Sequence, residues 1–126
     1  MQIDNTLLLD SFISLANNIV IHAVVILAII DIFTGMSAGL KCRELSSTKG
    51  LNGIIKHMCV LALILLVYPY MRILNLQMYA NLFVCFYIIS YAISILENLT
   101  ELGAPVPSFL VRYLSKVKSQ LDNGKE

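Results

Sequence analysis

Three long apolar runs, each bounded by charged or turn-forming residues, divide the chain. They cover residues 19–40, 54–73 and 78–102. An α-helix rises about 1.5 Å per residue, so a run of roughly 20 apolar residues spans the hydrocarbon core of a bilayer. The pattern therefore predicts an all-α membrane protein with three transmembrane helices.

The composition agrees with lipid as the main solvent. Of the 126 residues, 58% are hydrophobic and only 13% are charged, and the mean hydropathy is +0.79. A soluble domain carries about 25% charged residues, so this chain has too few polar side chains to cover a water-facing surface. Its length allows one domain, which we expect to cover residues 1–126.

The two ends of the chain each leave alternatives open. Residues 1–18 mix leucines with Asp4 and Asp10, which fits either a short interfacial helix or an extension of the first span. After residue 102, Gly103 suits a helix C-terminus and Pro105 cannot continue a helix. Residues 108–126 place apolar residues at helical spacing among basic ones. This pattern predicts a short amphipathic C-terminal helix on anionic lipid, or else a solvated basic tail.

The basic residues indicate how the chain crosses the membrane. A basic loop, residues 41–53, follows the first span, and residues 108–126 form a basic tail. The residues concerned are Lys41, Arg43, Lys49, Lys56, Arg112, Lys116 and Lys118. The positive-inside rule puts both segments in the cytoplasm, which predicts an N-out/C-in topology with three spans. Two spans alone, with the first helix lying on the cytoplasmic face, would satisfy the same rule.

One face of the first run carries small and polar residues. At 100° per residue, Ala28, Asp31, Gly35, Ala38 and Gly39 fall within an arc of about 100°. Gly35 and Gly39 form a G-x-x-x-G pattern, which lets helix backbones approach closely because no Cβ intervenes. We expect another helix to pack on this small face, with Asp31 facing that neighbour or water rather than lipid.

The third run carries a polar stripe of its own, whereas the second run has none. The residues of the stripe are Ser90, Ser94, Glu97 and Glu101, and with Tyr87 at its edge the stripe occupies an arc of about 80°. One interpretation is that the two polar faces meet between copies, or face water enclosed by a ring of copies, so that the small face serves oligomerisation. The other interpretation is that the acidic residues pair with Lys41, Arg43 or Lys56 within one protomer.

The sequence contains no recognisable catalytic motif. It has no paired nucleophile and base, no P-loop and no dinucleotide fingerprint. His22 and His57 lie in different segments without ligands at metal-binding spacing, and the three cysteines are widely separated. We therefore expect a non-enzymatic protein without a cofactor, a metal ion or a nucleic-acid partner.

Two stretches of the sequence resemble the toxin-secretion and phage-lysis holins. Residues 31–57, DIFTGMSAGLKCRELSSTKGLNGIIKH, resemble that family's D-x-x-T-G pattern followed by basic residues and L-S-S-x-x-G-x-x-G-I-x-[KR]. Residues 93–110, ISILENLTELGAPVPSFL, resemble its pair of an acidic residue and asparagine before L-G-x-P-x-P. Cys42 and Glu44 depart from the basic character of the family's loop. The resemblance implies structural or assembly roles for Asp31, Thr34, Gly35, Ser46, Ser47, Gly50, Gly53, Glu97, Asn98, Gly103, Pro105 and Pro107.

The resemblance also implies a function. Holins are small phage-encoded proteins that gather in the bacterial host's cytoplasmic membrane and form lesions that release a cell-wall hydrolase, the endolysin; relatives in toxin loci are associated with toxin release. A homo-oligomer in the lipid bilayer is implied, with endolysin or a toxin as passenger and an antiholin as a further partner. The alternative is a small membrane scaffold or transporter subunit without large-pore activity. An ion-selective channel has less support, because no filter sequence is visible.

Overall fold

The computed structural model describes residues 2–124, except for the side chains of Lys118 and Leu121. Its helices are α1 (Asn5–Ala16), α2 (Ile19–Lys41), α3 (Ser47–Ile73), α4 (Gln77–Glu101) and α5 (Ser108–Asn123), and residues 2–124 contain no strand. Three of these helices, α2, α3 and α4, are long and apolar enough to cross a membrane. The prediction of an all-α protein with three apolar spans and a C-terminal helix is confirmed.

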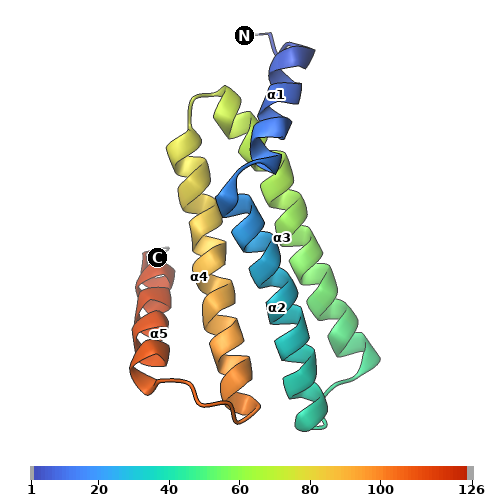
Figure 1. Cartoon of the computed structure of the whole chain (residues 1–126), viewed down its shortest axis with the longest axis vertical. Coiled ribbons are helices and arrows are strands. Elements are labelled where there is room, and N and C mark those ends of the chain that lie inside the picture. The colour runs from blue at the N-terminus through green and yellow to red at the C-terminus, as the bar shows by residue number, and fades with distance from the viewer. Residues whose placement is uncertain (1, 125–126) are drawn as a thin grey trace.

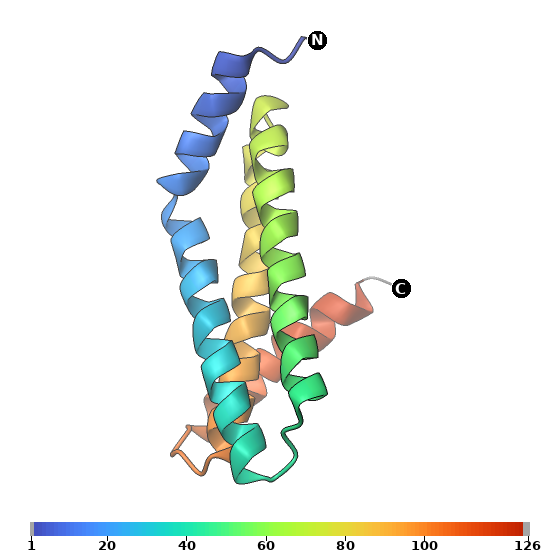
Figure 2. The same cartoon turned by 90° about the vertical axis from the view of Figure 1, so that its right-hand side faces the viewer.

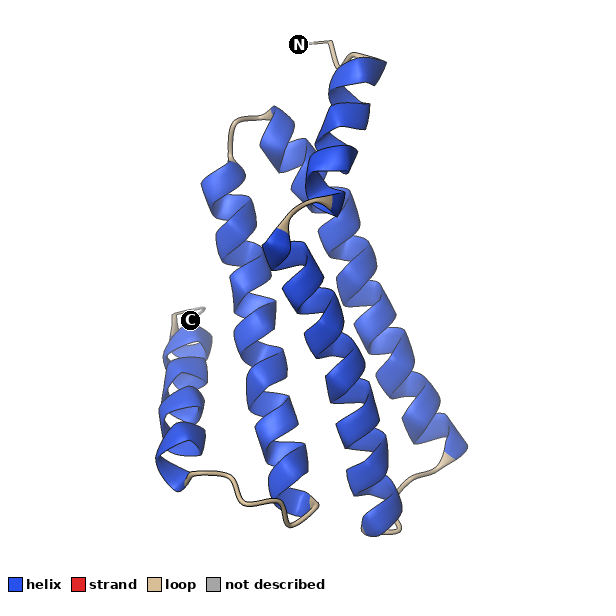
Figure 3. Ribbon diagram, in the orientation of Figure 1, coloured by secondary structure: helices blue, strands red, loops and turns tan. Residues whose placement is uncertain are grey.

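The three long helices lie side by side in an elongated bundle, in which α3 is antiparallel to both α2 and α4 (Figure 1). The α2–α3 loop and the segment from α4 to α5 lie at one end of the bundle (Figures 1 and 2). The α3–α4 loop and α1 lie at the other end. α5 then turns back beside α4 (Figure 3). Both basic segments of the sequence therefore begin at the same end of the bundle.

The bundle has a narrow apolar core, and most of its remaining apolar surface is exposed. Its buried residues include Val24, Ala28, Ile64, Tyr68, Ala80, Val84 and Tyr91. Outside this core, large side chains such as Phe33, Leu66 and Leu82 point outward on all three long helices. Water would disfavour so large an apolar surface, whereas hydrocarbon accepts it at no cost. An exposed apolar surface of this kind is typical of a helical bundle embedded in lipid.

Helix α3 packs less closely than its two neighbours. α2 and α4 contact each other along much of their length, while most side chains in the apolar part of α3 are exposed or only partly buried. α3 also begins at Ser47, seven residues before the predicted span at residue 54, because the Ser46 side chain caps it by accepting a hydrogen bond from the Lys49 amide (3.1 Å). Its first two turns are polar, so the helix extends beyond the apolar run.

Three of the helices end in the same way. The residue after each C-cap has a positive φ: Arg43 (55°) after α2, Asn75 (59°) after α3 and Gly103 (84°) after α4. In α4 the amide of Ala104 also donates to the carbonyl of Leu99 (3.0 Å), which completes a Schellman motif. The predicted end of this helix near Leu102, with Gly103 just after it, is confirmed.

The N-terminal segment forms a helix of its own. The helical structure is interrupted between α1 and α2 at Asn18, whose side chain accepts a hydrogen bond from the Val20 amide (2.9 Å) and caps α2. α1 packs on α3, where the Arg72 guanidinium donates to the carbonyl of Asp10 (3.2 Å). Of the two alternatives for residues 1–18, a separate short helix is therefore the one observed.

A buried tyrosine joins the three long helices at the α1 end of the bundle. The Tyr68 hydroxyl of α3 accepts hydrogen bonds from the amide side chains of Asn18, at the start of α2, and of Gln77, at the start of α4. It also donates to Asn81 Oδ1 (3.3 Å). The Tyr68 side chain is fully buried. Side-chain hydrogen bonds thus join all three long helices at this end of the bundle.

Candidate functional site

Asp31 of α2 is buried inside the bundle and hydrogen-bonded to α4. Only 7% of its surface is exposed. Its Oδ1 accepts a hydrogen bond from Asn98 Nδ2 (3.1 Å), and the same amide nitrogen lies 3.1 Å from the Thr34 hydroxyl oxygen. Exposing a charged or amide side chain to lipid at this depth costs free energy, because hydrocarbon offers no hydrogen-bond partner. The hydrogen bonds of Asn98 therefore favour the contact between α2 and α4.

The second oxygen of Asp31 faces α3. Its Oδ2 lies 3.5 Å from Nε2 of His57, and the His57 ring packs on the Tyr91 ring of α4 with centroids 5.2 Å apart. The polar pattern of the sequence does not indicate this contact between His57 and Asp31. A signal was available: Asp31 stands ten residues before α2 ends at Lys41, and His57 stands ten residues after α3 begins at Ser47. Residues equally far from a short loop between antiparallel helices lie at the same depth.

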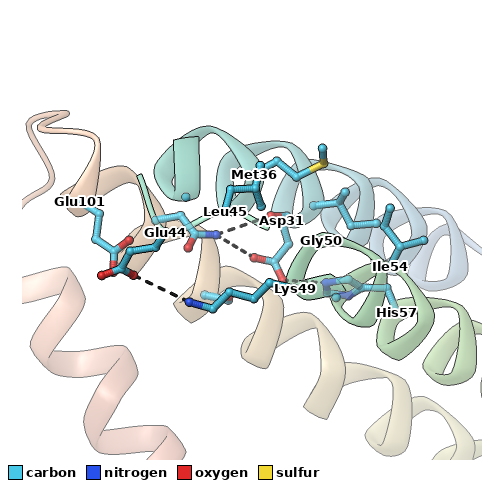
Figure 4. Close-up of a pocket in the computed structure, with 15 residues that line it drawn as sticks. Asp31, Met36, Glu44, Leu45, Lys49, Gly50, Ile54, His57 and Glu101 are labelled. Carbon is cyan, nitrogen blue, oxygen red and sulfur yellow. Dashed lines mark hydrogen bonds and ion pairs between the residues drawn. The ribbon is translucent and has the colours of Figure 1, made fainter. Parts of the chain in front are cut away.

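Two hollows flank the Asp31–His57 pair, and together we call them the cleft. The outer hollow, of about 300 Å³, reaches the α2–α3 loop; its small residues include Gly35, Gly39, Gly50 and Gly53 (Figure 4). The inner hollow, of about 410 Å³, lies deeper along α3 and α4. Asp31, His57 and Ser94 line both. The cleft arises because the loosely packed α3 leaves space beside α2 and α4.

The polar stripe of the third span borders this cleft. Ser90 and Glu97 line the inner hollow, Glu101 lines the outer one, and Ser94 lines both. Glu97 and Glu101 are exposed at its edge, and within residues 2–124 neither forms an ion pair. The two polar faces predicted from the sequence thus come together on one side of a single protomer.

The small face of α2 packs within the chain. Ala28 and Ala38 are buried, and a Cβ on Gly35 would lie 3.4 Å from Asn98 Nδ2. A Cβ on Gly39 would lie 3.3 Å from the Leu45 Cβ in the α2–α3 loop. Within the protomer, Asp31 and Gly35 of this face thus lie against α4, and Gly39 lies against the α2–α3 loop.

The basic residues have other partners than the ones proposed for them from the sequence. Lys41 Nζ donates to the carbonyl of Leu102 (2.8 Å) and so caps the C-terminus of α4. Lys49 forms an exposed ion pair with Glu44 (3.9 Å), and Lys56 borders the inner hollow. Arg43, Arg112 and Lys116 are exposed, and the side chain of Lys118 lies outside the described residues. The pairing of Asp31 with Lys41, Arg43 or Lys56 is therefore wrong; His57 and Asn98 take that place.

The polar residues around Asp31 come from the two stretches that resemble holins. Asp31, Thr34 and His57 belong to residues 31–57, and Asn98 belongs to residues 93–110. The sequence profile of the bacteriophage holin family matches residues 11–119. The chain belongs to the bacteriophage holin family.

Proteins similar to this chain occur in bacteria and in a phage. An uncharacterized protein of Clostridium perfringens is 38% identical over 93 residues, which cover 72% of this chain and 69% of that protein. A protein named as a probable holin of Bacillus phage phi105 is 29% identical over 102 residues, 80% of this chain and 76% of the phage protein. No solved structure is significantly similar to the chain. Family membership and three apolar helices make it a multi-pass membrane protein.

Proposed function

We propose that the protein is a holin, a non-enzymatic membrane protein whose copies gather in the bacterial cytoplasmic membrane and form lesions. An endolysin, or a toxin, would leave the cell through these lesions, without needing a direct contact. The observation that carries the proposal is the cleft: a holin-family bundle keeps a buried carboxylate, an imidazole and the serine and glutamate stripe of α4 on one side, beside its least enclosed helix.

The physical basis is a competition for polar partners. An aspartate in the middle of a bilayer costs about 2.5–3.5 kcal/mol, so the monomer keeps Asp31 paired with Asn98 and His57. At high protein density in the membrane, Asp31, His57 and the polar stripe of α4 can instead contact water that is enclosed between protomers. α3 then moves away from α2 and α4 at the loop end, while the Tyr68 cluster holds the other end. The transition is cooperative in protein concentration because each lesion needs many copies.

We further propose the N-out/C-in topology and a homo-oligomeric assembly. The α2–α3 loop and the start of the segment to α5 share one end of the bundle, so both basic segments can face the cytoplasm together. α5 leaves that end with Arg112 and Lys116 exposed, which suits contact with anionic headgroups. An antiholin would act by competing for the faces through which the copies meet.

Inducible expression in a bacterium tests this function. Growth should continue through a delay and then stop abruptly, and a co-expressed cytoplasmic enzyme should appear in the medium. A Met58→Leu variant, altered at an exposed apolar position of α3, should keep the same timing. Steady growth at high membrane levels of the protein would contradict the proposal and favour the membrane scaffold or transporter subunit.

A further inference from the structure

The inner hollow has the size of a ligand site. Its volume of about 410 Å³ lies within the range of roughly 300–1,000 Å³ that is typical of small-molecule pockets. The walls include Asp31 of α2, Lys56 and His57 of α3, and Tyr91, Ser94 and Glu97 of α4. Polar groups from three helices therefore converge on one space beside apolar side chains.

Two residues that line this hollow each have a buried polar atom without a partner in the described part of the chain. Tyr91 is only 5% exposed, yet its hydroxyl forms no hydrogen bond, and His57 Nδ1 has none either. Because His57 Nε2 faces the Asp31 carboxylate, the neutral imidazole carries its proton on Nε2, which leaves Nδ1 as an acceptor. Buried polar groups are rarely left unpaired, so these two atoms indicate a hydrogen-bonding ligand.

The charges at the hollow indicate the sign of that ligand. The carboxylates of Asp31 and Glu97 face one ammonium group, Lys56, and Glu97 forms no ion pair within residues 2–124. The wall is therefore negative when His57 is neutral. The described residues contain no group of three or more His, Cys, Asp or Glu side chains placed to hold a metal ion. An organic cation suits these acceptors better than a metal does.

We propose that the inner hollow binds a primary ammonium group carried on an apolar body. Its three N–H donors would bond to Glu97, to the Tyr91 hydroxyl and to His57 Nδ1. The ring of Tyr91 would cover the adjoining hydrocarbon, and the positive charge would balance the surplus carboxylate. Such a ligand binds the protomer itself, so the site exists whether or not copies form lesions.

Calorimetric titration of the protein in phosphatidylcholine nanodiscs tests this site. The probe is benzylammonium, and empty nanodiscs measure its partition into lipid. Benzylammonium should bind saturably. Benzyl alcohol, which lacks the charge, should not bind. Benzyltrimethylammonium has the charge but no N–H donor, so its affinity should be lower than that of benzylammonium by about tenfold or more.

Two variants identify the residues, and one serves as a control. Glu97→Gln should weaken benzylammonium binding about tenfold, and Tyr91→Phe, which keeps the ring and its packing, about threefold to tenfold. Glu101→Gln, one turn further along α4 and lining only the outer hollow, should change it less than twofold. Circular dichroism establishes that each variant keeps its helices.

Either of two results would overturn the site. One is the absence of saturable binding by the wild-type protein. The other is binding that neither Glu97→Gln nor Tyr91→Phe weakens although both variants are folded. Because these titrations need no lesion, their failure would leave the proposed holin function standing, and a failed growth assay would leave the ammonium site standing.

Discussion

Asp31 Oδ2 and His57 Nε2 lie 3.5 Å apart, at matched depth on two antiparallel helices joined by a short loop. This contact is the polar link between α3 and the closely packed pair of α2 and α4 at the loop end of the bundle. The spacing is longer than a good hydrogen bond, so the link is weak compared with the Asn98–Asp31 bond at 3.1 Å. The contacts between α2 and α4 are thus closer and more numerous than those between this pair and α3.

Removing the Asn98 amide should destabilise the folded protomer. Asn98→Ala leaves Asp31 Oδ1 and the Thr34 hydroxyl without this donor, so we expect a loss of about 1–2 kcal/mol in the free energy of unfolding. Equilibrium unfolding in mixed micelles measures it. Asn52→Ala, at an exposed position of α3, is the matched control and should change stability by less than about 0.5 kcal/mol.

Loosening α3 should advance the onset of growth arrest. His57→Leu removes the electrostatic contact with Asp31 while keeping an apolar side chain on α3. If the contact contributes about 1 kcal/mol, the open arrangement becomes about fivefold more populated, and the delay before arrest shortens. Timed growth curves at equal membrane levels provide the measurement. An unchanged or longer delay in His57→Leu would contradict the prediction, because it would mean that loosening α3 does not promote lesion formation.

The glycines of the cleft should differ in their tolerance of bulk. Gly35→Leu forces carbon atoms against Asn98, which we expect to cost about 1–3 kcal/mol and to delay or abolish killing. Gly53→Leu should be tolerated, because a Cβ there meets nothing within 4 Å. Unfolding in micelles and the growth assay together distinguish the two variants. If Gly35→Leu and Gly53→Leu changed stability and the timing of killing equally, close packing at Gly35 would have no special role.

A native cysteine offers a test of topology. Cys42 is exposed in the α2–α3 loop, so replacing Cys59 and Cys85 by Ala leaves a single thiol at that loop. With the proposed orientation, a membrane-impermeant maleimide labels Cys42 only after spheroplasts are lysed. A Gln2→Cys variant without the native cysteines should be labelled in intact spheroplasts. The reverse pattern of labelling would invert the topology.

Much of the fold could be predicted from the sequence, because lipid imposes simple rules. Backbone groups in hydrocarbon must be bonded within a helix, so apolar runs of sufficient length reveal the three spans. The stop at Gly103 was predictable for a similar reason: a positive φ after a helix strongly favours glycine. Asn75 adopts the same conformation, which asparagine also tolerates, whereas the positive φ of Arg43 is not favoured by its residue type.

The candidate site was less predictable. The sequence placed the small face and the α4 stripe on single helices, and both border the observed cleft. It did not identify His57 as the neighbour of Asp31, because α3 has no polar stripe and a lone histidine near the start of a predicted span is usually a packed or interfacial side chain. Which polar residues meet depends on helix rotation and on the close contact of α2 with α4, and neither follows from one helix's periodicity.

Release of size-graded dextrans from lipid vesicles tests the central claim most directly. Purified protein is reconstituted at increasing protein-to-lipid ratios, and release of trapped fluorescent dextrans is followed. We predict no release at low density and a steep onset above a threshold, with dextrans as large as a protein escaping. Retention of every dextran at all densities, with the protein remaining monomeric, would contradict the account.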